Sequence, residues 1–295
     1  MAQRDDEFQY IDEELKELGL DGPAPSVRRD DLTLSTGTLG TLVWGEHPEI
    51  AFLHGGGLNA HTWDSTVLAL GRPAIAIDLP GHGDSSWRDD FDYSPQTNAV
   101  AVAEALDALV PGVPQNVVGQ SLGGLTGIAL AGSRPDLVKS LVIVDVSPGI
   151  RFEDSAQVRD FLAGPQVFPS REDIVEKALA AGIGSSRRQL ERGVVLNTRV
   201  REDGTVVFKH HLANPPEGVA PSLGDFTTLW DAVIDSPVPV LLVRGSHGFL
   251  PPEVVAEFTE RVPRAIVVEI EAGHNVHEQK PAELAAAIGA FLDSH

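Results

Sequence analysis

The segment from Pro114 to Leu125 constrains the fold of this chain most strongly. It begins as a short apolar strand, passes through a turn of small residues that contains a serine, and continues into a helix. Within it, Gly119-Gln120-Ser121-Leu122-Gly123 matches the pattern G-x-S-x-G. The glycines permit a sharp turn that presents the serine hydroxyl, which becomes a useful nucleophile only beside a base and oxyanion-stabilising donors. A glycine-rich turn that only caps a helix has the same pattern, so the rest of the chain must decide.

Strands and helices alternate on both sides of this segment. A hairpin over 31–35 and 38–44 begins the predicted sheet, and the serine strand belongs to it. Further apolar strands are predicted at 50–53, 74–78, 139–144, 238–243 and 265–270. Packed helices are predicted at 97–109, 252–261 and 281–292. This alternation predicts an α/β fold with a mostly parallel sheet that helices cover on both faces.

The alternation fails between residues 149 and 236, which we interpret as a mainly helical cap inserted over the sheet. Polar helices are predicted there at 154–163, 171–181 and 186–196, and a hairpin at 200–208 turns on Asp203-Gly204. The core then comprises residues 26–148 and 237–295. Residues 1–25 form an N-terminal extension, in which apolar residues at helical spacing predict an amphipathic helix.

Composition excludes several function classes. The 295 residues carry 22 basic and 43 acidic side chains, and a net charge of −21 disfavours nucleic acid and anionic membranes as partners. The absence of cysteine excludes disulfides, a thiol nucleophile and a thiolate metal site. The acidic N-terminus lacks the apolar core of a signal peptide, and no apolar run reaches the roughly 18 residues that span a bilayer. We therefore expect a cytoplasmic protein with a small-molecule substrate, and leave its oligomeric state open.

Four landmarks occur in a characteristic order along the chain. They are His54-Gly55, the run from Asp78 to Gly83, the G-x-S-x-G turn, and Gly273-His274, each directly after a predicted strand. With these landmarks the chain after residue 30 resembles the α/β-hydrolase family. The resemblance implies that family's eight-stranded fold, with Ser121 as the nucleophile and His274 as the general base. It also implies an oxyanion hole from the backbone N–H groups of Gly56 and Leu122, and neither a metal nor another cofactor.

Other residues near these landmarks have more modest expected roles. We expect Gly57, Trp63 and Gln120 to line the substrate pocket. His54, His82 and Asp78 are expected to hold loops in place through hydrogen bonds rather than to bind a metal.

The triad acid is missing from its common position. Many relatives carry it three residues beyond a glycine after the strand at 238–243, but here that position is Gly248. His247, its neighbour, cannot replace a carboxylate. Some family members carry the acid after the strand that here ends before Asp145, so we predict Asp145 as the acid. Asp145 could instead cap the turn at 147–149, and the next candidates are Glu253, Asp231 and Asp235.

The resemblance and the residues together predict a serine hydrolase. It would cleave an ester or lactone of a small, mostly apolar or neutral substrate through an acyl-enzyme. Alternatives on the same fold are a carbon–carbon bond hydrolase, a cofactor-independent oxygenase or a perhydrolase, because fold does not determine chemistry. A non-enzymatic small-molecule receptor that keeps the pocket is a third hypothesis. Replacing Ser121 by alanine separates a serine hydrolase from an oxygenase, since an oxygenase that relies on the histidine keeps much of its rate. Slow or single-turnover hydrolysis would favour the receptor.

Overall fold

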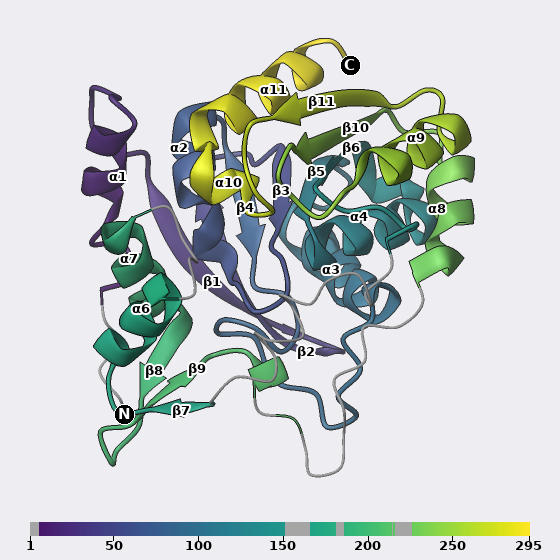
Figure 1. The fold of residues 1–295 in the computed structure, drawn as a ribbon. Coiled ribbons are helices and arrows are strands. Elements are labelled where there is room, and N and C mark those ends of the chain that lie inside the picture. The colour runs from purple at the N-terminus through teal and green to yellow at the C-terminus, as the bar shows by residue number, and fades with distance from the viewer. Residues whose placement is uncertain (1–5, 151–165, 181–185, 214, 216–225) are drawn as a thin grey trace.

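An eight-stranded sheet forms the centre of the computed structural model (Figure 1), which describes residues 6–150, 166–180, 186–213, 215 and 226–295. The strand order is β1-β2-β4-β3-β5-β6-β10-β11. The pairs β1–β2 and β2–β4 are antiparallel, and all other neighbours are parallel. The strands are β1 (Val27–Leu34), β2 (Gly37–Trp44), β3 (Ile50–Leu53), β4 (Ala74–Ile77), β5 (Gln115–Gln120), β6 (Val138–Val144), β10 (Val240–Gly245) and β11 (Ile266–Ile270).

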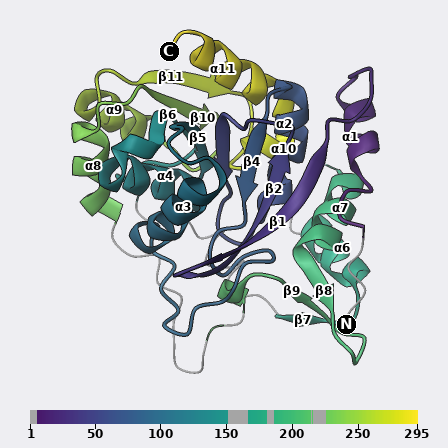
Figure 2. The same ribbon diagram turned by 180° about the vertical axis from the view of Figure 1, so that it is seen from behind.

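Helices cover both faces of this sheet (Figures 1 and 2). One face packs on α1 (Ile11–Glu17), α2 (Asp64–Leu70), α10 (Val276–Gln279) and α11 (Pro281–Asp293). The other packs on α3 (Pro95–Leu109), α4 (Leu122–Ser133), α8 (Trp230–Asp235) and α9 (Pro252–Arg261). Strands β3, β4 and β5 are buried along their whole length, as parallel strands between two helical layers must be. The predicted mostly parallel, eight-stranded α/β fold is confirmed.

The region predicted as a cap contains a second, small sheet. Its antiparallel strands are β7 (Val167–Phe168), β8 (Thr198–Val200) and β9 (Val206–Phe208), in the order β7-β9-β8. The hairpin on Asp203-Gly204 is confirmed as β8 and β9, whereas β7 was not predicted because two residues carry no periodic signal. Helices α6 (Arg171–Ala180) and α7 (Arg187–Asn197) confirm two of the predicted cap helices, and the third, at 154–163, lies outside the described residues. The division into core and cap stays a prediction.

Short 3-10 turns connect several of these elements. They are η1 (Ala60–Trp63), η2 (Pro135–Leu137), η4 (His211–Ala213) and η5 (Phe226–Leu229). The predicted N-terminal helix is confirmed as α1, with Ile11 and Leu15 buried in the core. Across the described ranges, no helix combines the length and the apolar character needed to cross a membrane.

Candidate active site

Ser121 occupies a strained turn between β5 and α4. Its backbone has φ 52° and ψ −119°, a conformation that non-glycine residues rarely adopt outside functional sites. The flanking glycines are required because a Cβ added at Gly119 would lie 2.3 Å from the Gly123 carbonyl oxygen. A Cβ added at Gly123 would lie 2.1 Å from the carbonyl oxygen of Leu53 on β3. The close packing of strand and helix thus leaves Ser121 on the outside of a tight bend, as the pattern predicted.

His274 and Asp145 form a hydrogen-bonded pair, although 129 residues separate them. His274 follows β11, and its Nδ1 lies 2.8 Å from Oδ2 of Asp145. Asp145 is fully buried at the end of β6, where its carboxylate also accepts hydrogen bonds from the N–H groups of Gly245 (3.0 Å) and Phe249 (2.7 Å). Because the carboxylate oxygen accepts the hydrogen bond from the imidazole, Nδ1 of His274 is the donor and Nε2 is left with its lone pair.

The position of Asp145 explains why residue 248 is a glycine. A Cβ added at Gly248 would lie 2.2 Å from Oδ2 of Asp145, so the carboxylate occupies the space of any side chain there. Asp145 does not cap the following turn, where the Gly149 N–H instead donates to Oγ of Ser147. Of the three other candidate acids, all are exposed: Glu253 lies on α9, and Asp231 and Asp235 lie on α8. None of them has the contact to His274 that Asp145 makes.

Gln120 binds the opposite side of the imidazole. Its side-chain amide donates to Nε2 of His274 at 2.9 Å and to the His274 carbonyl oxygen at 3.4 Å. This contact fits the tautomer that Asp145 imposes, because Nε2 is then an acceptor. Within the described residues the Ser121 hydroxyl makes no hydrogen bond to His274, and catalytic hydrogen bonds often form only once substrate is bound. Gln120, predicted as a pocket residue, therefore lies directly against the candidate base.

Phe249 is a site residue that sequence reasoning missed. Its ring stacks on the His274 imidazole with the centroids 3.7 Å apart and the planes inclined by 15°. Its backbone N–H also holds Asp145, so one residue contacts both members of the pair. The one sequence feature that could have indicated it is its place directly after Gly248, the residue at the common position of the triad acid. The stacked ring covers one face of the imidazole and restricts its rotation.

The glycine loop after β3 lies beside Ser121. A Cβ added at Gly55 would lie 3.3 Å from Cβ of Ser121. The N–H of Leu58 donates to the Gly55 carbonyl oxygen at 3.2 Å, and Gly57 has φ 80°, so residues 55–58 form a tight turn that needs glycine at its third position. On the other side of Ser121, Leu122 is the first residue of α4, where backbone N–H groups have no partner within the helix. The serine thus lies beside the glycine loop and directly before the first turn of α4.

Trp63 has a packing role rather than a place beside the serine. It is fully buried, with its ring centroid 5.0 Å from Phe52 and 4.8 Å from His277, because η1 turns its side chain back toward the sheet. We therefore no longer include Trp63 among the pocket residues.

The three loop-holding residues behave as expected. His54 Nδ1 donates to the Gly55 carbonyl oxygen (2.8 Å) while its Nε2 accepts from the Leu79 N–H (2.9 Å), and burial lowers the pKa of His54. Burial likewise holds the pKa of His82 well below its usual range, and its Nδ1 donates to the Pro80 carbonyl oxygen. Asp78 accepts from the Ala60 N–H at 2.7 Å. Both imidazoles are neutral supports of the loops around the serine.

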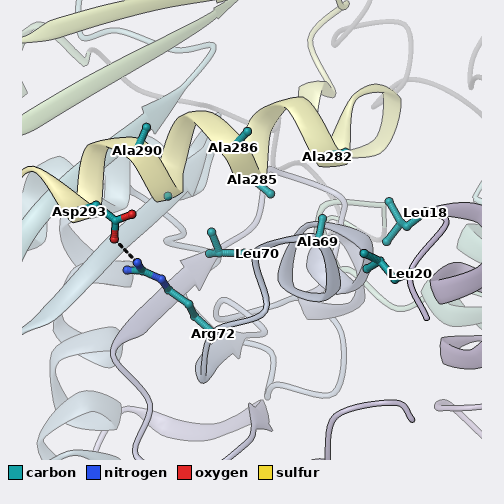
Figure 3. A pocket seen from close by; sticks show the side chains of 11 residues that line it. Leu18, Leu20, Ala69, Leu70, Arg72, Ala282, Ala285, Ala286, Ala290 and Asp293 are labelled. Carbon is teal, nitrogen blue, oxygen red and sulfur yellow. Dashed lines mark hydrogen bonds and ion pairs between the residues drawn. The ribbon is translucent and has the colours of Figure 1, made fainter. Parts of the chain in front are cut away.

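A surface pocket of 490 Å³ lies away from this site, between α2 and α11 (Figure 3). Alanine and leucine side chains line it, and Arg72 and Asp293 form an ion pair at one end. Neither Ser121 nor His274 borders it, so this pocket does not belong to the candidate active site.

Comparison with known proteins identifies the family. Residues 50–287 match the sequence profile of the Alpha/beta hydrolase family. The chain belongs to this family. It is 40% identical to Esterase Rv0045c of Mycobacterium tuberculosis over 98% of this chain and 96% of that protein. It is 28% identical to sn-1-specific diacylglycerol lipase ABHD11 of Mus musculus, over 83% of this chain and 81% of that protein.

Solved structures of family members have the same fold. A structure of the M. tuberculosis esterase Rv0045c superposes with a TM-score of 0.86 at 39% identity, covering 99% of this chain and all of that one. The order of Ser121, Asp145 and His274 along the chain is the order of nucleophile, acid and histidine in α/β hydrolases. Where many members of the family have a glutamate five residues after the histidine, this chain has Gln279, whose Oε1 accepts from the Gly273 N–H at 2.6 Å. The substitution thus still supports the loop that carries His274.

Proposed function

We propose that this chain is a carboxylic ester hydrolase that uses Ser121 as nucleophile, His274 as general base and Asp145 as the acid that orients it. The observation that carries the proposal is the hydrogen bond from His274 to the buried Asp145 carboxylate, next to a serine in a strained turn. The 40% identity to an esterase over nearly the whole chain supports ester hydrolysis over the other reactions of the fold.

The proposed reaction proceeds in two halves. In the first, Nε2 of His274 leaves the Gln120 amide and takes the proton from Ser121 as its oxygen attacks the ester carbonyl. The N–H groups of Gly56 and Leu122 stabilise the oxyanion, and His274 returns the proton to the leaving alcohol. In the second half, water, deprotonated by His274, attacks the acyl-enzyme and the acid product leaves with Ser121 restored. The ion pair with Asp145 stabilises the imidazolium in both halves.

The surroundings of Ser121 favour a small, mostly apolar or neutral substrate. Phe249 covers the imidazole, and Cδ1 of Leu212, from η4, lies 3.7 Å from the place that a Cβ on Gly56 would take. Apolar side chains therefore lie against the imidazole and beside the glycine loop. A lactone is an internal ester and fits the same chemistry, so both substrate types belong in the first screen.

Covalent labelling tests the proposal directly. Wild-type protein should react with a fluorophosphonate probe and hydrolyse short-chain nitrophenyl esters. Replacing Ser121 by alanine should abolish labelling and lower kcat by about 10⁶, with little change in Tm because the serine side chain packs little. Labelling that persists in Ser121→Ala, or wild-type protein that neither labels nor turns over, would refute the proposal.

A further inference from the structure

The C-terminal end of α7 is hydrogen-bonded to the glycine loop beside Ser121. Asn197 Nδ2 donates to the Gly57 carbonyl oxygen at 2.5 Å. In return, Asn59 Nδ2 donates to Oδ1 of Asn197 and to the carbonyl oxygen of Leu196, each at 3.2 Å. Three hydrogen bonds thus join segments that lie 137 to 140 residues apart in the sequence.

These bonds act on the part of the loop that has the least intrinsic rigidity. Gly56 and Gly57 are the two central residues of the turn, and glycine has the greatest backbone freedom of any residue. From the core, His54 holds only the Gly55 carbonyl oxygen. The Gly57 carbonyl is held by Asn197 of α7, and its direction sets the plane of the following peptide. The Leu58 N–H of that peptide donates to the Gly55 carbonyl oxygen, and the peptide of this carbonyl carries the Gly56 N–H, so fixing the first peptide plane also restricts the second.

Helix α7 is itself firmly attached, so Asn197 has a defined position. Near its middle, the guanidinium of Arg192 is 6% exposed and pairs with Oε2 of Glu17 on α1 at 2.9 Å. The side-chain amide of Gln189, also on α7, donates to the carbonyl oxygen of Glu278 at 3.0 Å. Glu278 lies four residues beyond His274. Figure 1 shows α7 beside α1, away from α8 and α9. The helix therefore contacts both the donor loop and the segment that follows the base.

We propose that Asn197 is a positioning residue for the oxyanion loop, so that α7 contributes to transition-state stabilisation. The effect of Asn197 on catalysis rests on the proposed function, whereas its effect on the loop does not. It assigns to Asn197 the task of keeping the Gly56 N–H aimed at the developing oxyanion. Donors of this kind act mainly in the transition state, so their misalignment lowers kcat more than it raises KM.

The test compares two variants at Asn197 with a matched control on the same helix. Asn197→Ala removes both hydrogen bonds, whereas Asn197→Asp keeps the acceptor for Asn59 and loses the donor to Gly57. Arg187→Gln is the control, because Arg187 pairs with Glu172 on α6 and does not contact the loop. On a nitrophenyl ester we expect both Asn197 variants to lose about 10- to 100-fold in kcat with KM within about twofold, less than the full loss of an oxyanion donor. The control should match wild type.

Hydrogen–deuterium exchange provides a second readout that does not depend on turnover. The amides of residues 55–58 should exchange at least about tenfold faster in Asn197→Ala than in Arg187→Gln, because the turn opens locally. Unchanged exchange, or Asn197→Asp with wild-type kcat, would overturn the inference, as would a rise in KM alone.

If wild-type protein hydrolyses no ester, the proposed function fails, and the exchange rates still decide whether Asn197 holds the loop. If Asn197→Ala does not fold, Asn197→Asp carries both measurements.

Discussion

At the residue scale, two non-glycine residues with positive φ meet at the site. Ser121 (φ 52°) and Asp145 (φ 50°) each stand at the carboxyl end of a strand, and β5 and β6 are adjacent in the sheet. Such conformations cost roughly 1–3 kcal/mol each and persist only where the surroundings impose them. The Asp145 carboxylate at the end of β6 meets His274, which follows β11. The two strained residues thus present a hydroxyl and a carboxylate at the ends of neighbouring strands.

The acid assignment predicts a large and specific loss. Asp145→Asn should fold but lose about 10³ to 10⁴ in kcat, because an amide at this position favours the wrong tautomer of His274. Glu253→Gln should remain near wild type, since Glu253 is exposed on α9. Steady-state kinetics on a nitrophenyl ester checks both variants. The reverse ranking would remove Asp145 from the triad.

A relocated carboxylate is the matched rescue for this prediction. Gly248 lies within a side chain's reach of the Asp145 carboxylate and does not have the positive φ that would require glycine. Adding Gly248→Asp to Asp145→Ala should therefore recover part of the lost kcat. Gly248→Asp alone should be impaired, because its Cβ would lie 2.2 Å from Oδ2 of Asp145.

At the element scale, α1 connects the core to α7 through buried charges. Glu14 is 5% exposed, accepts a hydrogen bond from Ser65 at the start of α2, and lies 3.5 Å from Arg192 on α7. Just before α1, Glu7 pairs with Arg29 on β1 at 2.7 Å and with His61 at 3.1 Å. Breaking a buried pair by removing one partner is costly, so this short helix contributes more than its length suggests.

The pKa values of this cluster predict how its stabilisation changes with pH. Burial, with the nearby Asp64 carboxylate, raises the pKa of Glu14 from 4.5 to about 7. Burial lowers the pKa of His61, but the carboxylates of Asp64 and Glu7 outweigh it and raise that pKa to about 9. Burial raises the pKa of Glu7, but hydrogen bonds from His61 and Arg29 outweigh it and lower it to about 2.

Above pH 4.5 the raised pKa values of Glu14 and His61 both make stability fall as pH rises. With Glu14 raised, the folded state holds a proton that the unfolded chain loses between pH 4.5 and 7, so stability falls as pH rises through that range. The contribution of His61 is fully present below its ordinary value of 6.5 and is lost as pH rises through about 9. Glu7 contributes above its ordinary value of 4.5, and this is lost as pH falls toward about 2. The stabilisation by the cluster is therefore greatest near pH 4.5, and it falls as the pH rises from there to about 9.

Removing residues 1–20 tests this contribution. The truncated protein should keep ester turnover, because the proposed catalytic residues lie downstream, but its Tm should be lower. The difference in Tm between full-length and truncated protein should be larger at pH 6 than at pH 9 in thermal-denaturation series. A difference that grows toward pH 9 would contradict the role of Glu14 and His61, and folded truncated protein without turnover would place α1 in the catalytic machinery.

At the scale of the whole molecule, a well-packed core carries a strongly negative charge. Both faces of the sheet are covered by apolar clusters, while the sequence has a net charge of −21. Self-repulsion of that size opposes the compact state, and salt screens it over about 10 Å at 0.1 M. Exposed ion pairs also weaken in salt, but each contributes only about 0–1 kcal/mol.

Salt should therefore stabilise the folded protein. Raising NaCl from about 0.02 to 0.5 M at pH 8 should increase Tm by a few degrees, as screening of the net charge outweighs the loss of surface pairs. Scanning calorimetry at several salt concentrations measures this. A Tm that falls steadily with salt would show that exposed ion pairs such as that of Arg187 with Glu172 dominate over self-repulsion.

The sequence alone determined the fold class and two of the three triad candidates. Ser121 and His274 could be predicted because a glycine-flanked serine between strand and helix, and a Gly-His after the last strand, are local patterns. Asp145 was predicted as the acid from the family resemblance, with Glu253, Asp231 and Asp235 as further candidates. The hydrogen bond to His274 now distinguishes it, since strand order in the sheet decides which chain ends meet.

Only the tertiary structure decided the residues that contact the site from distant segments. Phe249 stacks on His274 across a loop, and Asn197 reaches Gly57 from a helix 140 residues further along the chain. Trp63, expected beside the substrate, packs in the core because η1 turns inward. The physical reason is common to all three: local periodicity records which face of an element is apolar, whereas contacts between elements depend on how the whole chain packs.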